Sequence, residues 1–168
     1  VVMGSVVPLR EPGRYLAVFH DAGAYIAAHG RRTDTFTLYA TCSEDGGLHW
    51  SPPRAIWSGQ DIHLCEPGVI RSPDGRRLAM LLRENRRVRG SYIMFSDDEG
   101  EHWSAPAEMP RARTGDRHTL RYAPDGRIVC VFRAATPEGM RGRSFSSVNE
   151  NVDQSGNGSP FEGDCVAW

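Results

Sequence analysis

The sequence predicts an all-β fold built from short antiparallel strands in repeated units. Two turn motifs predict it, because each occurs more than once and each is flanked by strand-like apolar segments. Composition is the third observation, since 18 glycines and 11 prolines among 168 residues are typical of a chain with many turns. The apolar segments are too short for helices and have the length of buried strands.

The first motif has the pattern S-x-D-x-G-x-x-W and occurs at residues 43–50 and 96–103. In each copy the Asp carboxylate can accept backbone N–H bonds within the turn, and the Gly relieves a steric conflict. The Trp can pack back into the core, so both indoles are predicted to be mostly buried. The residues with this structural role are Ser43, Asp45, Gly47, Trp50, Ser96, Asp98, Gly100 and Trp103.

The second motif is Pro-Asp-Gly-Arg, at residues 73–76 and 124–127, with a degenerate copy at 12–14. Gly after Asp supplies the positive φ that a tight hairpin requires. Each copy leads into an apolar segment that is closed by a polar residue. These closing residues are Arg83, Arg133 and His20.

The two motifs interleave, so each unit is strand, hairpin, strand, loop, strand, turn, strand. Four antiparallel strands repeating about every 50 residues are typical of a β-propeller blade. We predict a single partial propeller domain over residues 1–168. It comprises a blade at about 1–58, a second at about 62–110 and an incomplete third at about 115–168 with a long loop at 136–160. The chain is expected to be a fragment, because it begins at Val1 and ends inside an apolar segment.

The first motif is identified as the Asp-box, or bacterial neuraminidase (BNR) repeat, and its two copies in register with the hairpins resemble the sialidase superfamily. The resemblance covers most of residues 1–133. It implies a six-bladed propeller, of which this chain would supply two to three blades. Sialidases bind a sugar carboxylate with three arginines, and they use a tyrosine nucleophile, activated by a Glu, with a separate Asp as acid/base. The Asp-boxes themselves are structural and lie away from the ligand.

Carried over to this sequence, the resemblance implies that Glu66 polarises the nucleophile and that Arg83 belongs to the arginine triad. Arg117 and Arg133 hold the corresponding positions one unit later and are substrate-binding candidates. The alternative is a Glu–Arg ion pair that needs no ligand. Because these side chains share equivalent positions, we expect them to converge at one end of the units. Several arginines at one end repel each other, so we also expect an acidic ligand there.

Two further candidates complete the expected catalytic set. The resemblance implies that Asp34 is the acid/base, with Asp21 as a competing candidate and a solvent-exposed loop residue as the alternative. His118 has no sialidase counterpart but could act as an acid/base near neutral pH. The alternative for His118 is a core or turn-capping histidine.

Two family features are absent from this sequence. No Arg-Ile-Pro motif precedes the first unit, and none of the five tyrosines has the position of the nucleophile. The function expected is a fragment of a sialidase-like glycoside hydrolase acting on acidic, carboxylated glycans. A non-catalytic propeller that binds glycans or proteins is the alternative, and whether the parent is an enzyme stays open. The isolated chain is expected to be inactive.

The charge and composition of the chain limit the classes of binding partner that can be expected. The formal net charge of −1 argues against nucleic-acid binding, and no apolar segment approaches the roughly 20 residues of a membrane-spanning helix. No two of the four cysteines are spaced as a metal or redox pair, so no metal and no cofactor are expected. The expected partners are an acidic glycan or sialoside and the remaining blades of the parent. From the resemblance, secretion or a periplasmic location is expected.

Overall fold

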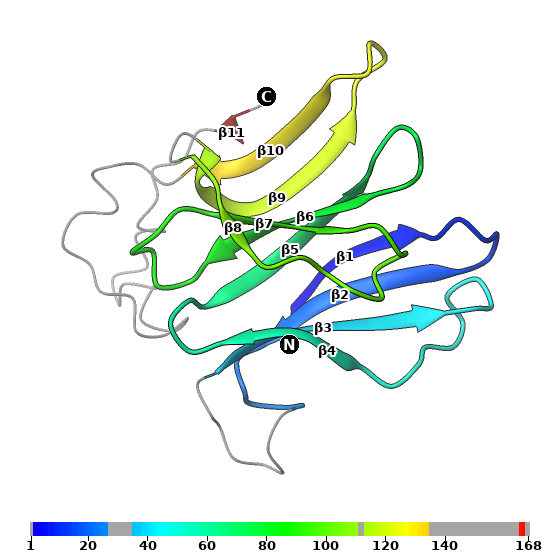
Figure 1. Cartoon of the computed structure of the whole chain (residues 1–168), viewed down its shortest axis with the longest axis horizontal. Coiled ribbons are helices and arrows are strands. Elements are labelled where there is room, and N and C mark those ends of the chain that lie inside the picture. The colour runs from blue at the N-terminus through cyan, green and yellow to red at the C-terminus, as the bar shows by residue number, and fades with distance from the viewer. Residues whose placement is uncertain (1, 27–34, 111–112, 135–164, 167–168) are drawn as a thin grey trace.

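The computed structural model describes residues 2–26, 35–110, 113–134 and 165–166, and its regular elements are β-strands in antiparallel sheets (Figure 1). These residues contain no α-helix, which confirms the all-β class. None of the described segments forms a helix long and apolar enough to cross a membrane. The long loop expected at 136–160 lies outside the described residues.

Three sheets follow one another along the chain, and every paired strand is antiparallel. The first sheet has the order β1 (Val2–Pro8), β2 (Tyr15–Asp21), β3 (Phe36–Ser43), β4 (Arg54–Gly59). The second has the order β5 (Leu64–Arg71), β6 (Leu78–Glu84), β7 (Tyr92–Ser96), β8 (Ala107–Glu108). The third has the order β11 (Cys165–Val166), β10 (Ile128–Ala134), β9 (Gly115–Tyr122).

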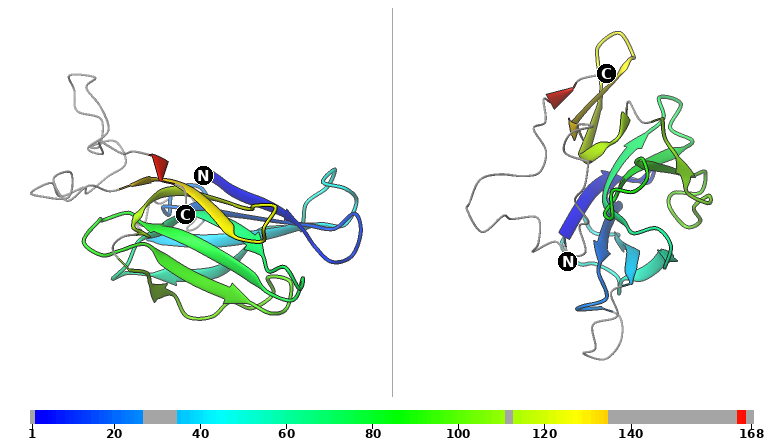
Figure 2. Two further views of the ribbon diagram at one scale, coloured as in Figure 1. Left: turned by 90° about the horizontal axis from the view of Figure 1, so that it is seen from above. Right: turned by 90° about the vertical axis from the view of Figure 1, so that its left-hand side faces the viewer.

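The opening strands of the three sheets, β1, β5 and β9, lie next to one another (Figures 1 and 2). Two glycines permit this close approach. A Cβ atom at Gly4 would overlap Pro67, and one at Gly68 would overlap the carbonyl oxygen of His118. The Val69 N–H also donates to Ser5 Oγ across β5 and β1, at 3.3 Å. A cavity of about 240 Å³ lies between the three strands, lined by residues 4–7, 68–69 and 118–121.

Two apolar cores hold the sheets together. The larger core joins the first and second sheets and includes Leu16, Leu38, Met80 and Leu82, all fully buried. A smaller core joins the second and third sheets through residues such as Leu81, Leu120 and Phe132. The strands of each sheet therefore bury side chains toward the neighbouring sheet, as the short apolar segments predicted.

The S-x-D-x-G-x-x-W segments form two equivalent turns, between β3 and β4 and between β7 and β8. In the second, Asp98 Oδ1 accepts bonds from the Ser96 hydroxyl and the His102 N–H, both at 2.9 Å. The indole Nε1–H of Trp103 donates to the Gly100 carbonyl at 3.1 Å. The first turn repeats this pattern, with matching hydrogen bonds at Asp45 and Trp50.

The two tryptophans differ in burial, which corrects the prediction that both are mostly buried. Trp103 is partly buried and packs against the core between the first and second sheets. Trp50 is 39% exposed. The reason is position, because the turn at 96–103 lies against the first sheet, whereas no described sheet covers the turn at 43–50.

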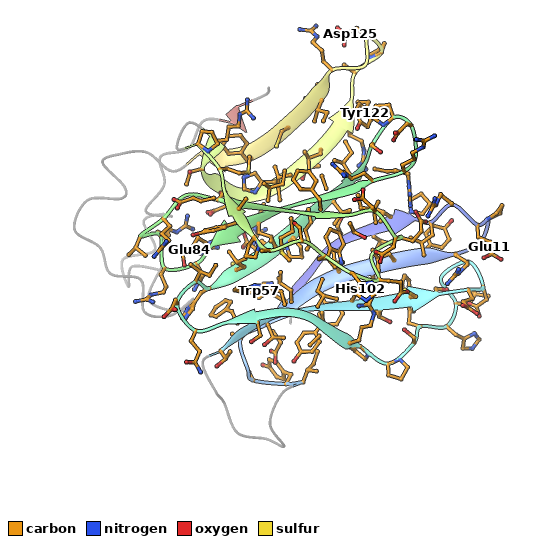
Figure 3. All side chains as sticks on the ribbon, in the orientation of Figure 1. Glu11, Trp57, Glu84, His102, Tyr122 and Asp125 are labelled. Atoms are coloured by element: carbon orange, nitrogen blue, oxygen red, sulfur yellow. The ribbon has the colours of Figure 1, made fainter. Side chains whose placement is uncertain are left out.

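The hairpin turns lie at the end of the sheets opposite to the closing ends of β2, β6 and β10. Gly13, Gly75 and Gly126 have φ values of 83°, 74° and 84° in these turns, as the motif predicted. Figure 3 shows Glu11 and Asp125 of two hairpins at one side and Glu84, which ends β6, at the other. The predicted site residues Glu66 and Arg83 therefore lie at the Glu84 end.

Candidate functional site

Each of the opening strands β5 and β9 is interrupted near its start by a β-bulge. In β5, the pairing with β6 shifts register between Cys65 and Gly68. In β9, the pairing with β10 shifts register opposite Val131 and Arg133 of β10. Glu66 has a φ of 50° in the first bulge and Arg117 a φ of 53° in the second. A residue other than glycine seldom adopts this left-handed conformation, which costs roughly 1–3 kcal/mol and is enriched at functional sites.

Arg83 lies beneath the first bulge and is 6% exposed. Its Nη1 donates to Glu66 Oε1 at 3.0 Å, and its Nη2 donates to Asn85 Oδ1 at 2.9 Å. Its Nε lies 3.3 Å from Asp116 Oδ1. The two predicted residues Glu66 and Arg83 are thus in direct contact, and the guanidinium is engaged on three sides.

Asp116 and Arg87 form a second buried ion pair next to the first. Asp116 is fully buried, and its two carboxylate oxygens lie 2.7 and 2.8 Å from Arg87 Nη1 and Nη2. Two arginines therefore meet two carboxylates, Glu66 and Asp116. These buried charges balance within the protein, so Arg83 by itself does not require an acidic ligand.

Arg117 differs from these buried arginines. Its side chain is 77% exposed, and its Nε lies 3.7 Å from Glu66 Oε1. Glu66 is only 13% exposed, and its Oε2 is buried without a hydrogen-bond partner among the described residues. An exposed guanidinium therefore stands beside a carboxylate that has one oxygen unused.

Comparison with family models matches residues 1–147 to the BNR repeat-like domain. The chain belongs to the BNR repeat-like domain family. This membership confirms the resemblance to BNR repeat proteins that the turn motifs indicated.

Two solved structures resemble this BNR repeat-like domain. A protein of unknown function from Dyadobacter fermentans has a TM-score of 0.61 and 19% identity over 79% of this chain, which shows a shared fold. The Hadza microbial sialidase Hz136 has a TM-score of 0.45 and 21% identity over 72% of this chain. The chain spans 34% of the length of the first structure and 26% of the second. Comparison with curated protein sequences gave no match.

In this BNR repeat-like domain, His118 lies in the core between the second and third sheets. It is 4% exposed, and its ring stacks on Phe132 at a centroid distance of 5.2 Å. Burial lowers the pKa of His118, which disfavours the protonated ring. This environment matches the core histidine that the sequence left open as the alternative to an acid/base.

The two aspartates proposed as acid/base have different outcomes. Asp21 is buried, and its Oδ2 accepts the N–H groups of Tyr25 and Ile26 at 3.1 Å each. Burial acts to raise the pKa of Asp21, but these backbone hydrogen bonds outweigh it and lower the pKa. The carboxylate thus shapes the start of the β2–β3 connection. Asp34 lies outside the described residues.

Arg133 pairs through its backbone with Asp116 and Cys165, which places it at the same end of the third sheet. The Arg133 side chain lies outside the described part of the structure.

The described thiols of Cys42, Cys65 and Cys130 are free, and burial raises the pKa of Cys65. Among the described residues, no group of His, Cys, Asp and Glu is arranged to hold a metal ion.

Sequence reasoning did not propose Arg87 or Asp116 for this site, and it gave His20 only as the residue that closes its strand. Asp116 directly precedes Arg117, just as Cys65 directly precedes Glu66 in the preceding unit. This equivalent position was the sequence signal that could have placed Asp116 at the site. Arg87 follows β6 at a φ of 58°, in a turn that no motif marks. His20 Nδ1 accepts the backbone N–H of Glu66 at 3.2 Å, a contact between sheets that no local pattern encodes.

Proposed function

We propose that this chain forms part of a six-bladed, sialidase-like propeller that binds acidic glycans at the end where Glu66 and Arg117 lie. Family membership, the three successive antiparallel sheets and the adjacent opening strands support the propeller. In this proposal the S-x-D-x-G-x-x-W turns are Asp-boxes, which fasten outer turns and take no part in binding.

One observation carries the ligand site: equivalent bulges of β5 and β9 hold Glu66 and Arg117 in the strained left-handed conformation. Glycine at either position would adopt this conformation without strain, yet the sequence has Glu66 and Arg117 there. Arg117 presents a largely exposed guanidinium, whose planar fork suits a sugar carboxylate. Arg83 is already engaged on three sides, so in this proposal it holds Glu66 while Arg117 contacts the ligand.

For a hydrolase of the sialidase type, Glu66 would polarise a tyrosine supplied by another part of the parent protein. Asp34 would then stand at the rim as acid/base, with Arg133 adding a further guanidinium. The unused Oε2 of Glu66 is compatible with such a partner. Catalysis further requires the tyrosine, for which this sequence offers no candidate at the expected position.

A non-catalytic acidic-glycan binder is the second candidate, and one observation favours it. Arg83 is 6% exposed and paired with Glu66, so it is not free to hold a sugar carboxylate as an arginine of a sialidase triad does. A binder requires only the exposed charge of Arg117 and a shaped pocket, without nucleophilic chemistry.

The test uses the full-length protein with sialyllactose as the acidic probe and lactose as the neutral one. We expect sialyllactose alone to bind, and Arg117→Ala to weaken its affinity at least tenfold. Arg121→Ala is the matched control, because Arg121 is another exposed arginine of β9 that bonds only its neighbour's carbonyl in the described contacts. Equal affinity for both sugars, or equal losses in both variants, would contradict the proposal. Release of 4-methylumbelliferone from its sialoside separates the hydrolase from the binder.

A further inference from the structure

Glu66 is held from two sides, by Arg83 at its carboxylate and by His20 at its backbone. His20 belongs to β2 of the first sheet and is 8% exposed. Its Nδ1 accepts the Glu66 N–H at 3.2 Å. The bulge is thus tied to the neighbouring sheet, in addition to its own.

The bulge creates the need for this acceptor. Between Cys65 and Gly68 the ladder between β5 and β6 is interrupted, so the Glu66 N–H has no partner strand. Pro67 has no N–H, which leaves Glu66 as the donor within the interrupted pair. A buried N–H without an acceptor is costly, and His20 supplies the acceptor from outside the sheet.

Stacking fixes the orientation of the imidazole. His20 and Phe36 have ring centroids 5.9 Å apart with an interplanar angle of 9°. Phe36 in turn stacks on His63, at 5.0 Å and 17°. Because the ring plane is fixed by this stack, Nδ1 is kept directed at the bulge. As an acceptor Nδ1 carries no proton, so the proton of the neutral ring is on Nε2.

We propose that His20 is a positioning residue for Glu66: its unprotonated Nδ1 fixes the strained bulge and thereby the direction of the Glu66 carboxylate. The consequence for the site rests on the proposed function, in which Glu66 belongs to the ligand-binding end. Protonation of His20 would place an N–H opposite the Glu66 N–H, so two donors would face each other and the bulge would lose its tie to the first sheet.

The surroundings keep the ring neutral. Burial lowers the pKa of His20 to about 4, assisted by the positive charge of Arg83, while Asp21 acts in the opposite direction. Among the described residues, Glu66 and, beyond Phe36, His63 are the other titratable groups in contact with His20 or its ring stack. His20 is therefore an acceptor at neutral and mildly acidic pH.

Two variants separate the acceptor from the ring. His20→Phe retains an aromatic ring against Phe36 but has no acceptor, whereas His20→Asn places an oxygen near the position of Nδ1 and does not titrate. His118→Phe is the matched control, because His118 is also a buried, stacked histidine but has no hydrogen bond to Glu66.

The first readout is the Glu66 amide in ¹H–¹⁵N NMR spectra of the full chain, which requires no ligand. We expect its resonance to move in His20→Phe and to stay near the wild-type position in His20→Asn and His118→Phe. As the pH falls through about 4, it should move further in the wild type than in His20→Asn, because the Asn side chain does not titrate. A Glu66 amide that moves no further in His20→Phe than in His118→Phe overturns the proposal. If His20→Phe does not fold, the pH titrations of the wild type and His20→Asn decide.

The second readout is the affinity for sialyllactose at pH 7. We expect His20→Phe to bind about tenfold more weakly, which corresponds to about 1.4 kcal/mol. His20→Asn should remain within about threefold of the wild type, a difference well under 1 kcal/mol. A wild type that binds no acidic sugar refutes the proposed function while leaving the amide result to stand. Unchanged affinity in His20→Phe, with a displaced Glu66 amide, overturns the link from the bulge to the ligand.

Discussion

Replacing Asp98 by Ala should destabilise the protein by removing the carboxylate that organises the β7–β8 turn. Asp98 Oδ1 accepts bonds from the Ser96 hydroxyl and the His102 N–H at 2.9 Å each, and Oδ2 lies 2.7 Å from His102 Nδ1. A hydrogen bond contributes roughly 0.5–1.5 kcal/mol net, and this carboxylate is partly solvated, so we expect a total loss of about 1–3 kcal/mol.

The loss should extend beyond the turn, because the same turn joins two sheets. Glu99 accepts bonds from both terminal nitrogens of Arg71, at 2.5 and 3.0 Å, and from the Arg10 N–H at 2.7 Å. Arg54 of the first sheet donates to the Gly100 carbonyl at 2.5 Å. A disordered turn would release these contacts together.

Asp45→Ala is the matched control for this prediction. Asp45 makes the same hydrogen bonds within its turn, but among the described residues its turn does not join two sheets. We therefore expect Asp98→Ala to unfold at a clearly lower urea concentration than Asp45→Ala, measured by circular dichroism and Trp fluorescence. A loss in Asp45→Ala as large as in Asp98→Ala would refute the reasoning. Any affinity for an acidic sugar should be the same in both variants.

The pH dependence adds an independent check on the same carboxylate. The hydrogen bond from the His102 backbone, followed by the contact with its side chain, lowers the pKa of Asp98 to about 2. The unfolded chain has an ordinary Asp pKa of about 3.9, so Asp98 stabilises the fold above about pH 4. This contribution should decline as the pH falls from about 4 to about 2, and Asp98→Ala should lack the decline.

Three other perturbations have defined outcomes. Gly68→Ala places a Cβ against the His118 carbonyl and should destabilise more than Gly126→Ala, which has a positive φ but open space, as compared by thermal unfolding. Arg83→Ala leaves the Glu66 carboxylate buried without its partner and should cost about 3–5 kcal/mol in urea unfolding, whereas an exposed ion pair costs under about 1 kcal/mol. The pKa of His20 lies below its unfolded value, so stability should fall as the pH drops from about 6.5 to about 4, and a His20→Asn variant with the same acid slope would contradict this.

The fold was predictable from the sequence because its signals are local. The Asp-Gly hairpins, the S-x-D-x-G-x-x-W turns and the short apolar segments each specify structure within a few residues. Their spacing then marks the equivalent strands of successive sheets, which is how Glu66 and Arg83 could be placed at one end. The exposure of Trp50 was not predictable in this way, because it depends on which sheet covers the turn and not on the turn itself.

The site was only partly predictable, because its decisive contacts join segments from different sheets. Asp116 lies beside Arg83 across two sheets, and His20 reaches Glu66 from a third. A count of arginines at one end therefore missed Asp116, which together with Glu66 balances the buried Arg83 and Arg87. The repeat marks the positions of Asp116 and His20, but neither the pairing of Asp116 with Arg83 nor the contact of His20 with Glu66 can be read from it.

These contacts divide the charged residues at the Glu84 end of the sheets into a buried group and an exposed residue with different roles. Arg83 and Arg87 are buried and balanced by Glu66 and Asp116, so their charges hold the second and third sheets together. Arg117 is exposed and adds a positive charge that the buried residues do not neutralise fully, at 3.7 Å from Glu66. In the proposed function Arg117 would contact the acidic ligand, because the buried arginines would have to give up their carboxylates to bind one. Substitutions of the buried group should change stability first, and substitution of Arg117 should change ligand affinity first.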